Sequence, residues 1–67
     1  MTEKEKELAR LLVETKDFEK DEFIAIGLLC SSENAAGEMI EYLRENPDAD
    51  FYELLKKAVE LSDENNQ

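Results

Sequence analysis

Apolar residues recur at helical spacing near the start of the 67-residue chain. Leu8, Leu11 and Leu12 fall on one side of a helix, and Thr2 and Glu5 ahead of them have the spacing of a capping box. This pattern predicts a helix over residues 3–14. Residues 15–18 then read as a connection, and the acidic side chains that follow suit the positive end of a second helix.

The second predicted helix contains the longest uncharged run of the chain, Phe23-Ile24-Ala25-Ile26-Gly27-Leu28-Leu29-Cys30. The length of the run and its β-branched residues also fit a buried strand, but no other segment offers a strand for it to pair with. We therefore expect a helix over residues 21–30, buried on most of its circumference. Gly27 costs such a helix about 1 kcal/mol relative to alanine, which predicts that another helix crosses closely there.

Two amphipathic segments follow. Ser31-Ser32 provides an N-cap for a helix over residues 33–45, which ends ahead of Pro47 because proline disfavours a helical conformation in the residue before it. Asp50 and Glu53 repeat the capping-box spacing at the start of a helix over residues 51–61. The predicted core consists of Leu8, Leu11, Leu12, Phe23, Ile24, Leu28, Met39, Ile40, Leu43, Phe51, Leu54, Leu55 and Ala58.

These patterns together predict an all-α protein, a compact orthogonal bundle of four short helices around the buried second helix. Residues 1–62 are expected to form a single helical domain, and residues 63–67 a frayed polar C-terminal tail. Since Leu28 lies within the apolar run, Leu28→Asp is expected to unfold the domain.

The net charge of −10 is unevenly distributed. Residues 1–16 carry four acidic and four basic side chains, whereas residues 17–67 carry the other fourteen acidic side chains and only four basic ones. Such a surface repels phosphate backbones and anionic lipid and attracts a basic protein. A single cysteine, an N-terminus that alternates Glu and Lys, and the lack of an apolar run of about 20 residues favour a cytoplasmic protein that neither spans nor binds a membrane.

Acidic residues are plentiful, but paired carboxylates need an enclosed cleft for acid–base catalysis, and four short helices offer little such volume. The chain has no histidine, and Cys30 ends the most apolar run, as a small buried hydrophobic residue does. Asp48 and Asp50 resemble the opening of a calcium loop, but Glu53 stands where that loop requires glycine and Val59 where it requires an acid. We therefore expect no enzyme, no cofactor and no metal site.

Residues 24–43 resemble a helix-turn-helix motif, with a tight corner at residues 30–32 and with Ala35 and Met39 facing inward. Leu29 stands where the turn of that motif has glycine. The helix over residues 33–45 would be the one that enters the DNA groove, and its net negative charge would repel phosphate. Its charged residues are Glu33, Glu38, Glu41, Arg44 and Glu45. The resemblance supports this helix pair in the fold, but we expect no nucleic-acid partner. A degenerate helix-turn-helix regulator is the alternative function.

The remaining expectation is a non-enzymatic protein–protein interaction module. Its expected partner is another protein, such as a basic one, or a second copy in a homodimer. The acidic surface of residues 33–50 has three possible roles. It is an ordinary solvated surface, it binds a basic protein, or it imitates nucleic-acid phosphates and so occupies a protein that binds DNA or RNA. Phe18 and Phe51 either stay partly exposed or cap the ends of the core. The predicted partner-binding residues are Glu33, Glu38, Glu41, Tyr42, Glu45, Asp48, Asp50 and Tyr52.

Overall fold

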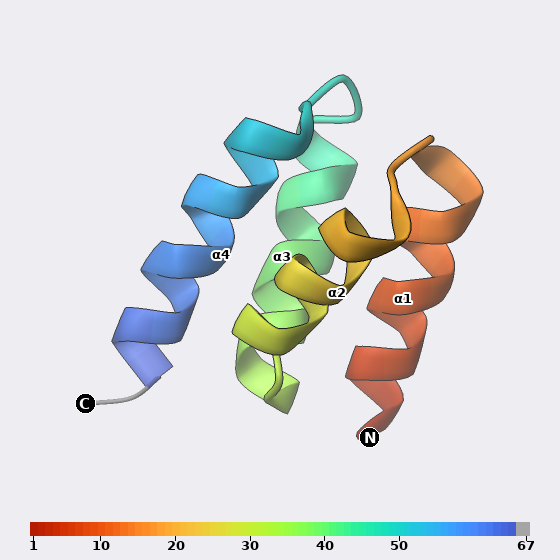
Figure 1. The fold of residues 1–67 in the computed structure, drawn as a ribbon. Helices are drawn as coiled ribbons and strands as arrows, with labels where there is room; N and C mark the ends of the chain where they lie inside the picture. Colours follow the sequence, from red (N-terminus) through yellow and green to blue (C-terminus); the bar gives the residue numbers. More distant parts are fainter. Residues whose placement is uncertain (66–67) are drawn as a thin grey trace.

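The computed structural model describes residues 1–65, which form four α-helices joined by short connections (Figure 1). The helices are α1 (Glu3–Thr15), α2 (Lys20–Leu29), α3 (Glu33–Glu45) and α4 (Phe51–Asn65). The predicted all-α class and compact four-helix bundle are confirmed. Helix α4 continues beyond its predicted end at residue 61, and residues 66–67 of the expected polar tail lie outside the described residues.

Capping side chains start three of the helices where the sequence predicts them. At α1 the Glu5 amide donates to Thr2 Oγ1 over 3.2 Å, and the Glu5 carboxylate accepts from the Thr2 amide over the same distance. At α3 the Ser32 hydroxyl accepts a hydrogen bond from the Ala35 amide. At α4 the Asp50 carboxylate accepts one of 2.9 Å from a first-turn amide. These bonds satisfy amides that have no partner within their own helix.

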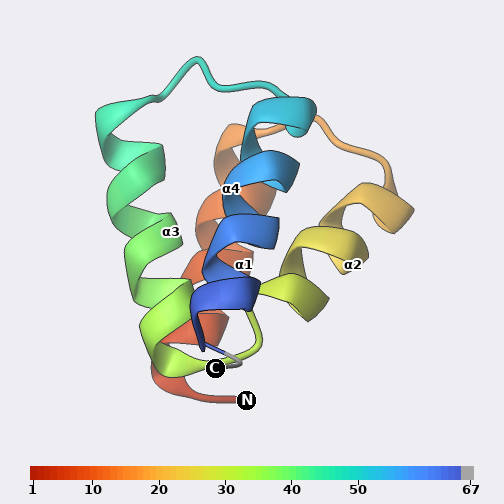
Figure 2. The same ribbon diagram turned by 90° about the vertical axis from the view of Figure 1, so that its left-hand side faces the viewer.

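The helices form a ring in which each packs against two others. Helices α1 and α4 lie on opposite sides of the bundle, and both pack against α2 and α3, which occupy the other two sides (Figures 1 and 2). The core lies between the four helices. Its buried apolar residues are Leu8, Leu12, Ile26, Cys30, Ala35, Ala36, Met39, Ile40, Leu43, Ala49, Leu54, Ala58 and Leu61.

Aromatic rings close one end of this core. The ring of Phe18, in the connection between α1 and α2, lies 5.5 Å from the ring of Phe23 and 5.6 Å from that of Phe51. All three side chains are half-buried and pack against the core. Of the two predicted alternatives for Phe18 and Phe51, the structure therefore supports capping of the core.

Helix α2 is buried on one side only, which corrects the sequence prediction. Ile26 and Cys30 are 0% and 1% exposed, whereas Ile24 is 47% and Leu28 is 70% exposed. The placement of Ile24 and Leu28 in the core is therefore wrong. The physical reason is the position of α2 in the ring, where α1 and α4 cover its inner side and no helix of the described chain covers its outer side.

The predicted close crossing of another helix at Gly27 is also wrong. Gly27 is exposed, and a Cβ atom added there would meet no heavy atom of a neighbouring element within 4 Å. We therefore expect Gly27→Ala to raise the free energy of unfolding by about 0.5–1 kcal/mol, because alanine loses less backbone entropy in a helix. Urea denaturation checks this value. The matched variant is Gly37→Ala on α3, which has equally open surroundings, and a lower midpoint for Gly27→Ala would contradict the prediction.

Lys16 links two connections that are far apart in the sequence. Its Nζ donates hydrogen bonds of 2.7 Å to the carbonyl oxygens of both Pro47 and Ala49, in the connection between α3 and α4. We expect Lys16→Met, which keeps the length of the side chain, to lower the free energy of unfolding by about 1–3 kcal/mol because two charge-assisted bonds are lost. Thermal denaturation measures the change. Lys56→Met, at an exposed position on α4, is the control and should change stability by less than about 0.5 kcal/mol.

Candidate protein-binding surface

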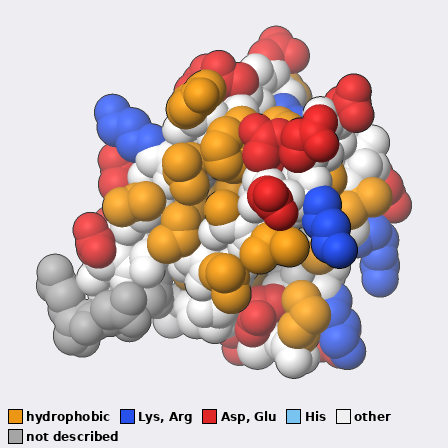
Figure 3. All heavy atoms as spheres, in the orientation of Figure 1, with side chains coloured by type: hydrophobic (Ala, Val, Ile, Leu, Met, Phe, Trp, Pro, Cys, Tyr) orange, Lys and Arg blue, Asp and Glu red, His pale blue; other side chains and the backbone are white. Residues whose placement is uncertain are grey.

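The exposed large apolar side chains are concentrated on one side of the molecule. Within the described residues they come from α1, α2, α4 and the N-terminal Met1, and none comes from α3. Figure 3 shows apolar side chains gathered over the face that has α2 in front, with acidic and basic side chains around them. Across the described residues, the large apolar side chains that are exposed belong to Met1, Val13, Ile24, Leu28, Tyr52 and Val59.

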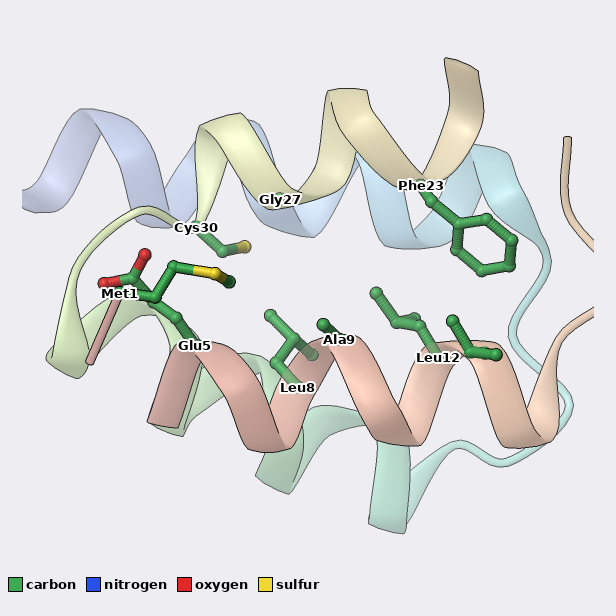
Figure 4. A pocket seen from close by; sticks show the side chains of 9 residues that line it. Met1, Glu5, Leu8, Ala9, Leu12, Phe23, Gly27 and Cys30 are labelled. Atoms are coloured by element: carbon green, nitrogen blue, oxygen red, sulfur yellow. The ribbon is translucent and has the colours of Figure 1, made fainter. Parts of the chain in front are cut away.

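A hollow between α1 and α2 opens on this side (Figure 4). Leu8 and Leu12 on α1 point toward α2, and Phe23 and Cys30 on α2 point toward α1. The hollow has a volume of about 90 Å³. We call it the α1–α2 hollow, and we call the exposed residues Val13, Ile24, Gly27 and Leu28 beside it the apolar face. The lining residues are Met1, Glu5, Leu8, Ala9, Leu12, Val13, Phe23, Gly27 and Cys30.

The chemistry of the α1–α2 hollow favours an apolar group. Glu5 is its single charged lining residue, and the Glu5 carboxylate already accepts the Thr2 amide. Burial raises the pKa of the Cys30 thiol to about 11, so the thiol stays protonated at neutral pH and is a poor nucleophile. An apolar cavity of about 150 Å³ accepts a benzene-sized molecule. The smaller hollow therefore suits the end of one aliphatic side chain.

Three of the predicted partner-binding residues lie together on the opposite side of the molecule. Glu33, Glu38 and Glu41 line a second, open hollow along α3, together with Lys4 and Arg44 at its edge. Both cations also lie near Glu7 of α1, at 3.4 Å and 3.6 Å. Within the described residues the three glutamates form no ion pair, so we call them the α3 acidic surface.

The other predicted acidic residues continue this surface only in part. Glu45 is exposed at the last turn of α3, and Asp48 is exposed in the connection that follows. Asp50 is exposed as well, but its carboxylate caps α4. Its cap role is the one predicted from the sequence. No group of three or more potential metal ligands occurs among the described residues.

The two predicted tyrosines have different surroundings. Tyr42 on α3 is half-buried, and Lys57 of α4 places its Nζ 5.6 Å from the centre of the Tyr42 ring. Tyr52 in the first turn of α4 is 78% exposed, and its ring packs against that of Phe51 at 5.8 Å. Tyr52 lies at the surface, as predicted. Tyr42 is half-buried where α3 contacts α4.

Sequence reasoning missed the apolar face. The available signal was the length of the uncharged run in α2, since a helix that is apolar on all sides exposes part of that surface unless other elements surround it. In this molecule the outer side of α2 remains uncovered, and Ile24, Gly27 and Leu28 are exposed there.

None of the helices within residues 1–65 combines the length and the apolar character needed to cross a bilayer. Comparisons of the chain with protein-family models, with curated proteins and with solved structures find no match.

Proposed function

We propose that the chain is a small non-enzymatic protein-interaction module that binds its partner through the apolar face. The observation that carries this proposal is the exposure of Val13, Ile24 and Leu28 around the α1–α2 hollow. Large apolar side chains gathered on one surface are costly in water and are typical of surfaces that another protein covers. A hollow beside such side chains gives a partner residue a place to anchor.

The lack of histidine and the burial of the single thiol support a binding function. The sequence has no histidine to serve as a general base at neutral pH. Its single thiol, Cys30, is buried and has a raised pKa. A lone reduced cysteine also fits a cytoplasmic protein, which is the compartment we propose.

The α3 acidic surface supports a second candidate, which is binding of a basic protein. Glu33, Glu38 and Glu41 lie along one hollow without ion-pair partners in the described chain, and the negative potential of residues 17–67 would steer a basic partner toward them. The same charges would let the surface imitate nucleic-acid phosphates. A helix-turn-helix regulator has less support, because α2 packs against α1 and α4, whereas that motif packs its two helices against each other.

Capture of partners from a lysate with matched variants tests the proposal. The tagged wild-type protein is compared with Leu28→Asp on the apolar face and with the double variant Glu38→Lys, Glu41→Lys on the α3 acidic surface. A partner that survives a high-salt wash, is lost with Leu28→Asp and is kept by the double variant supports binding through the apolar face. A partner that is lost in high salt and with the double variant, but kept by Leu28→Asp, would transfer the function to the α3 acidic surface.

A further inference from the structure

Two neighbouring residues of α2 have no structural explanation within a single chain. Gly27 weakens the helix, yet no side chain or backbone of another element approaches it. Leu28 beside it is 70% exposed. The chain thus places a projecting aliphatic side chain directly next to a hollow that Gly27 lines. A surface with both a projection and a recess can be complementary to itself.

We infer that a second copy of this chain covers the apolar face. The helices α2 of the two copies cross in antiparallel directions at a two-fold axis, and Leu28 of each copy enters the α1–α2 hollow beside Gly27 of the other. This inference rests on the proposed function and names the partner. A two-fold axis is the usual symmetry of protein dimers and requires that one patch meets the same patch on the second subunit. A glycine at the crossing lets two helix backbones approach closely.

The size of the surface restricts where a second copy can bind. A standard interface takes about 800 Å² from each partner, which is about one sixth of the 4632 Å² that this molecule exposes. An interface of that size occupies one whole side of so small a bundle. The side formed by α1 and the outer surface of α2 exposes Val13, Ile24 and Leu28, whereas the side formed by α3 exposes several glutamates.

The distribution of charge favours the same side. Two copies with a net charge of −10 each repel one another, and the whole excess of negative charge lies in residues 17–67. Helix α1, which forms one wall of the α1–α2 hollow, comes from the segment in which acidic and basic side chains are equal in number. An approach through α1 and the outer side of α2 keeps the α3 acidic surfaces of the two copies apart. The repulsion that remains on this side comes from Glu19, Asp21 and Glu22 at the start of α2, where Lys20 is the single base.

Sedimentation equilibrium of the wild-type chain tests the inference. The mass should rise with concentration from 7.7 kDa to twice that value. Association should be stronger in about 0.5 M than in about 0.02 M NaCl, because salt screens the repulsion between two acidic molecules. A basic partner on the α3 acidic surface would show the opposite dependence. A wild-type mass of 7.7 kDa at concentrations up to about 1 mM, where even a millimolar dimer would be half formed, overturns the inference.

Two matched pairs of variants locate the contact. Leu28→Asp should raise the dissociation constant about a hundredfold, since each copy loses one buried leucine. Asn34→Asp, which adds the same charge at an exposed position of α3 on the opposite side, should change it less than about twofold. Gly27→Ala should weaken association while it stabilises each copy, whereas Gly37→Ala should stabilise each copy without weakening association. A dimer that is indifferent to Leu28→Asp and Gly27→Ala overturns the inference.

A disulfide tests the geometry at the two-fold axis. In a Cys30→Ala background, a mixture of Leu28→Cys and Gly27→Cys chains should oxidise to a covalent dimer, because position 28 of one copy lies beside position 27 of the other. A mixture of Glu41→Cys and Gly27→Cys chains should not form that dimer, and the reverse result overturns the inference. Failure of self-association remains distinguishable from failure of the proposed function. A monomeric chain that still captures another protein through Leu28 keeps the proposed function, whereas a dimeric chain whose captured partners do not depend on the apolar face loses it.

Discussion

Ile26→Asp is expected to unfold the protein, whereas Leu28→Asp, two positions further along the same helix, should leave it folded. Ile26 is 0% exposed and Leu28 is 70% exposed. An aspartate at position 26 would place an unpaired charge in the core at a cost of several kcal/mol. A chain of this size has a stability of only about 3–10 kcal/mol. An aspartate at position 28 stays in water and should cost less than about 1 kcal/mol. This expectation replaces the sequence-based one for Leu28.

Circular dichroism and urea denaturation measure both variants, and a graded series at position 26 separates packing from charge. Ile26→Val should cost about 0.5–1.5 kcal/mol and Ile26→Ala about 2–5 kcal/mol, in proportion to the volume removed from the core. If Leu28→Asp unfolded the chain while Ile26→Asp did not, the side of α2 that faces the core would be the opposite of the one described.

Alkaline pH is expected to destabilise the protein through Cys30. Burial of the Cys30 side chain raises the pKa of its thiol from 9.0 to about 11. A thiol with a raised pKa in the folded state holds its proton more tightly there than in the unfolded state. Its contribution to stability is therefore fully present below pH 9 and is lost as the pH rises toward 11. A shift of this size corresponds to about 3 kcal/mol in the free energy of unfolding.

Cys30→Ala provides the control for this prediction. The informative quantity is the difference in the free energy of unfolding between the wild-type chain and the variant, each followed by urea denaturation from pH 8 to pH 11. The variant lacks the thiol, and its stability should fall less steeply. Equal slopes for both chains would show that Cys30 ionises at the same pH when folded and unfolded, which would contradict its burial.

The sequence determines the orientation of a helix where polar residues mark its outer side. In α3 the stripe of Met39, Ile40 and Leu43 is buried as predicted, and so are Leu54 and Ala58 in α4. The predicted helix starts at Thr2, Ser32 and Asp50 and the predicted helix end before Pro47 also agree with the observed helix ends. A capping side chain binds backbone amides only a few residues away, so its effect can be read from the local sequence. These features depend on local chemistry, which a single sequence contains.

Helix α2 shows where this reasoning fails. Residues 23–30 contain no charged side chain, so no polar side of the helix marks which of these residues face water and which face the core. The packing of α1 and α4 makes that choice, and it places Ile26 and Cys30 inside and Ile24 and Leu28 outside. The candidate site was missed for the same reason, since two residues of the apolar face, Ile24 and Leu28, are assigned to the core from the sequence alone. The α3 acidic surface was predictable because acidic side chains at helical spacing stay in water wherever the helix packs.

The bonds made by Lys16 change where the chain is open to proteolysis. Irregular exposed connections are usually cleaved first, because a protease needs several residues to leave the folded body together. Asn46, Pro47 and Asp48 form such a connection by sequence and exposure. Their neighbour Ala49, however, is only 4% exposed, and the Pro47 and Ala49 carbonyls are held by the side chain that follows α1. Because Lys16 holds both carbonyls, we expect the link between α3 and α4 to resist proteolysis despite its irregular backbone.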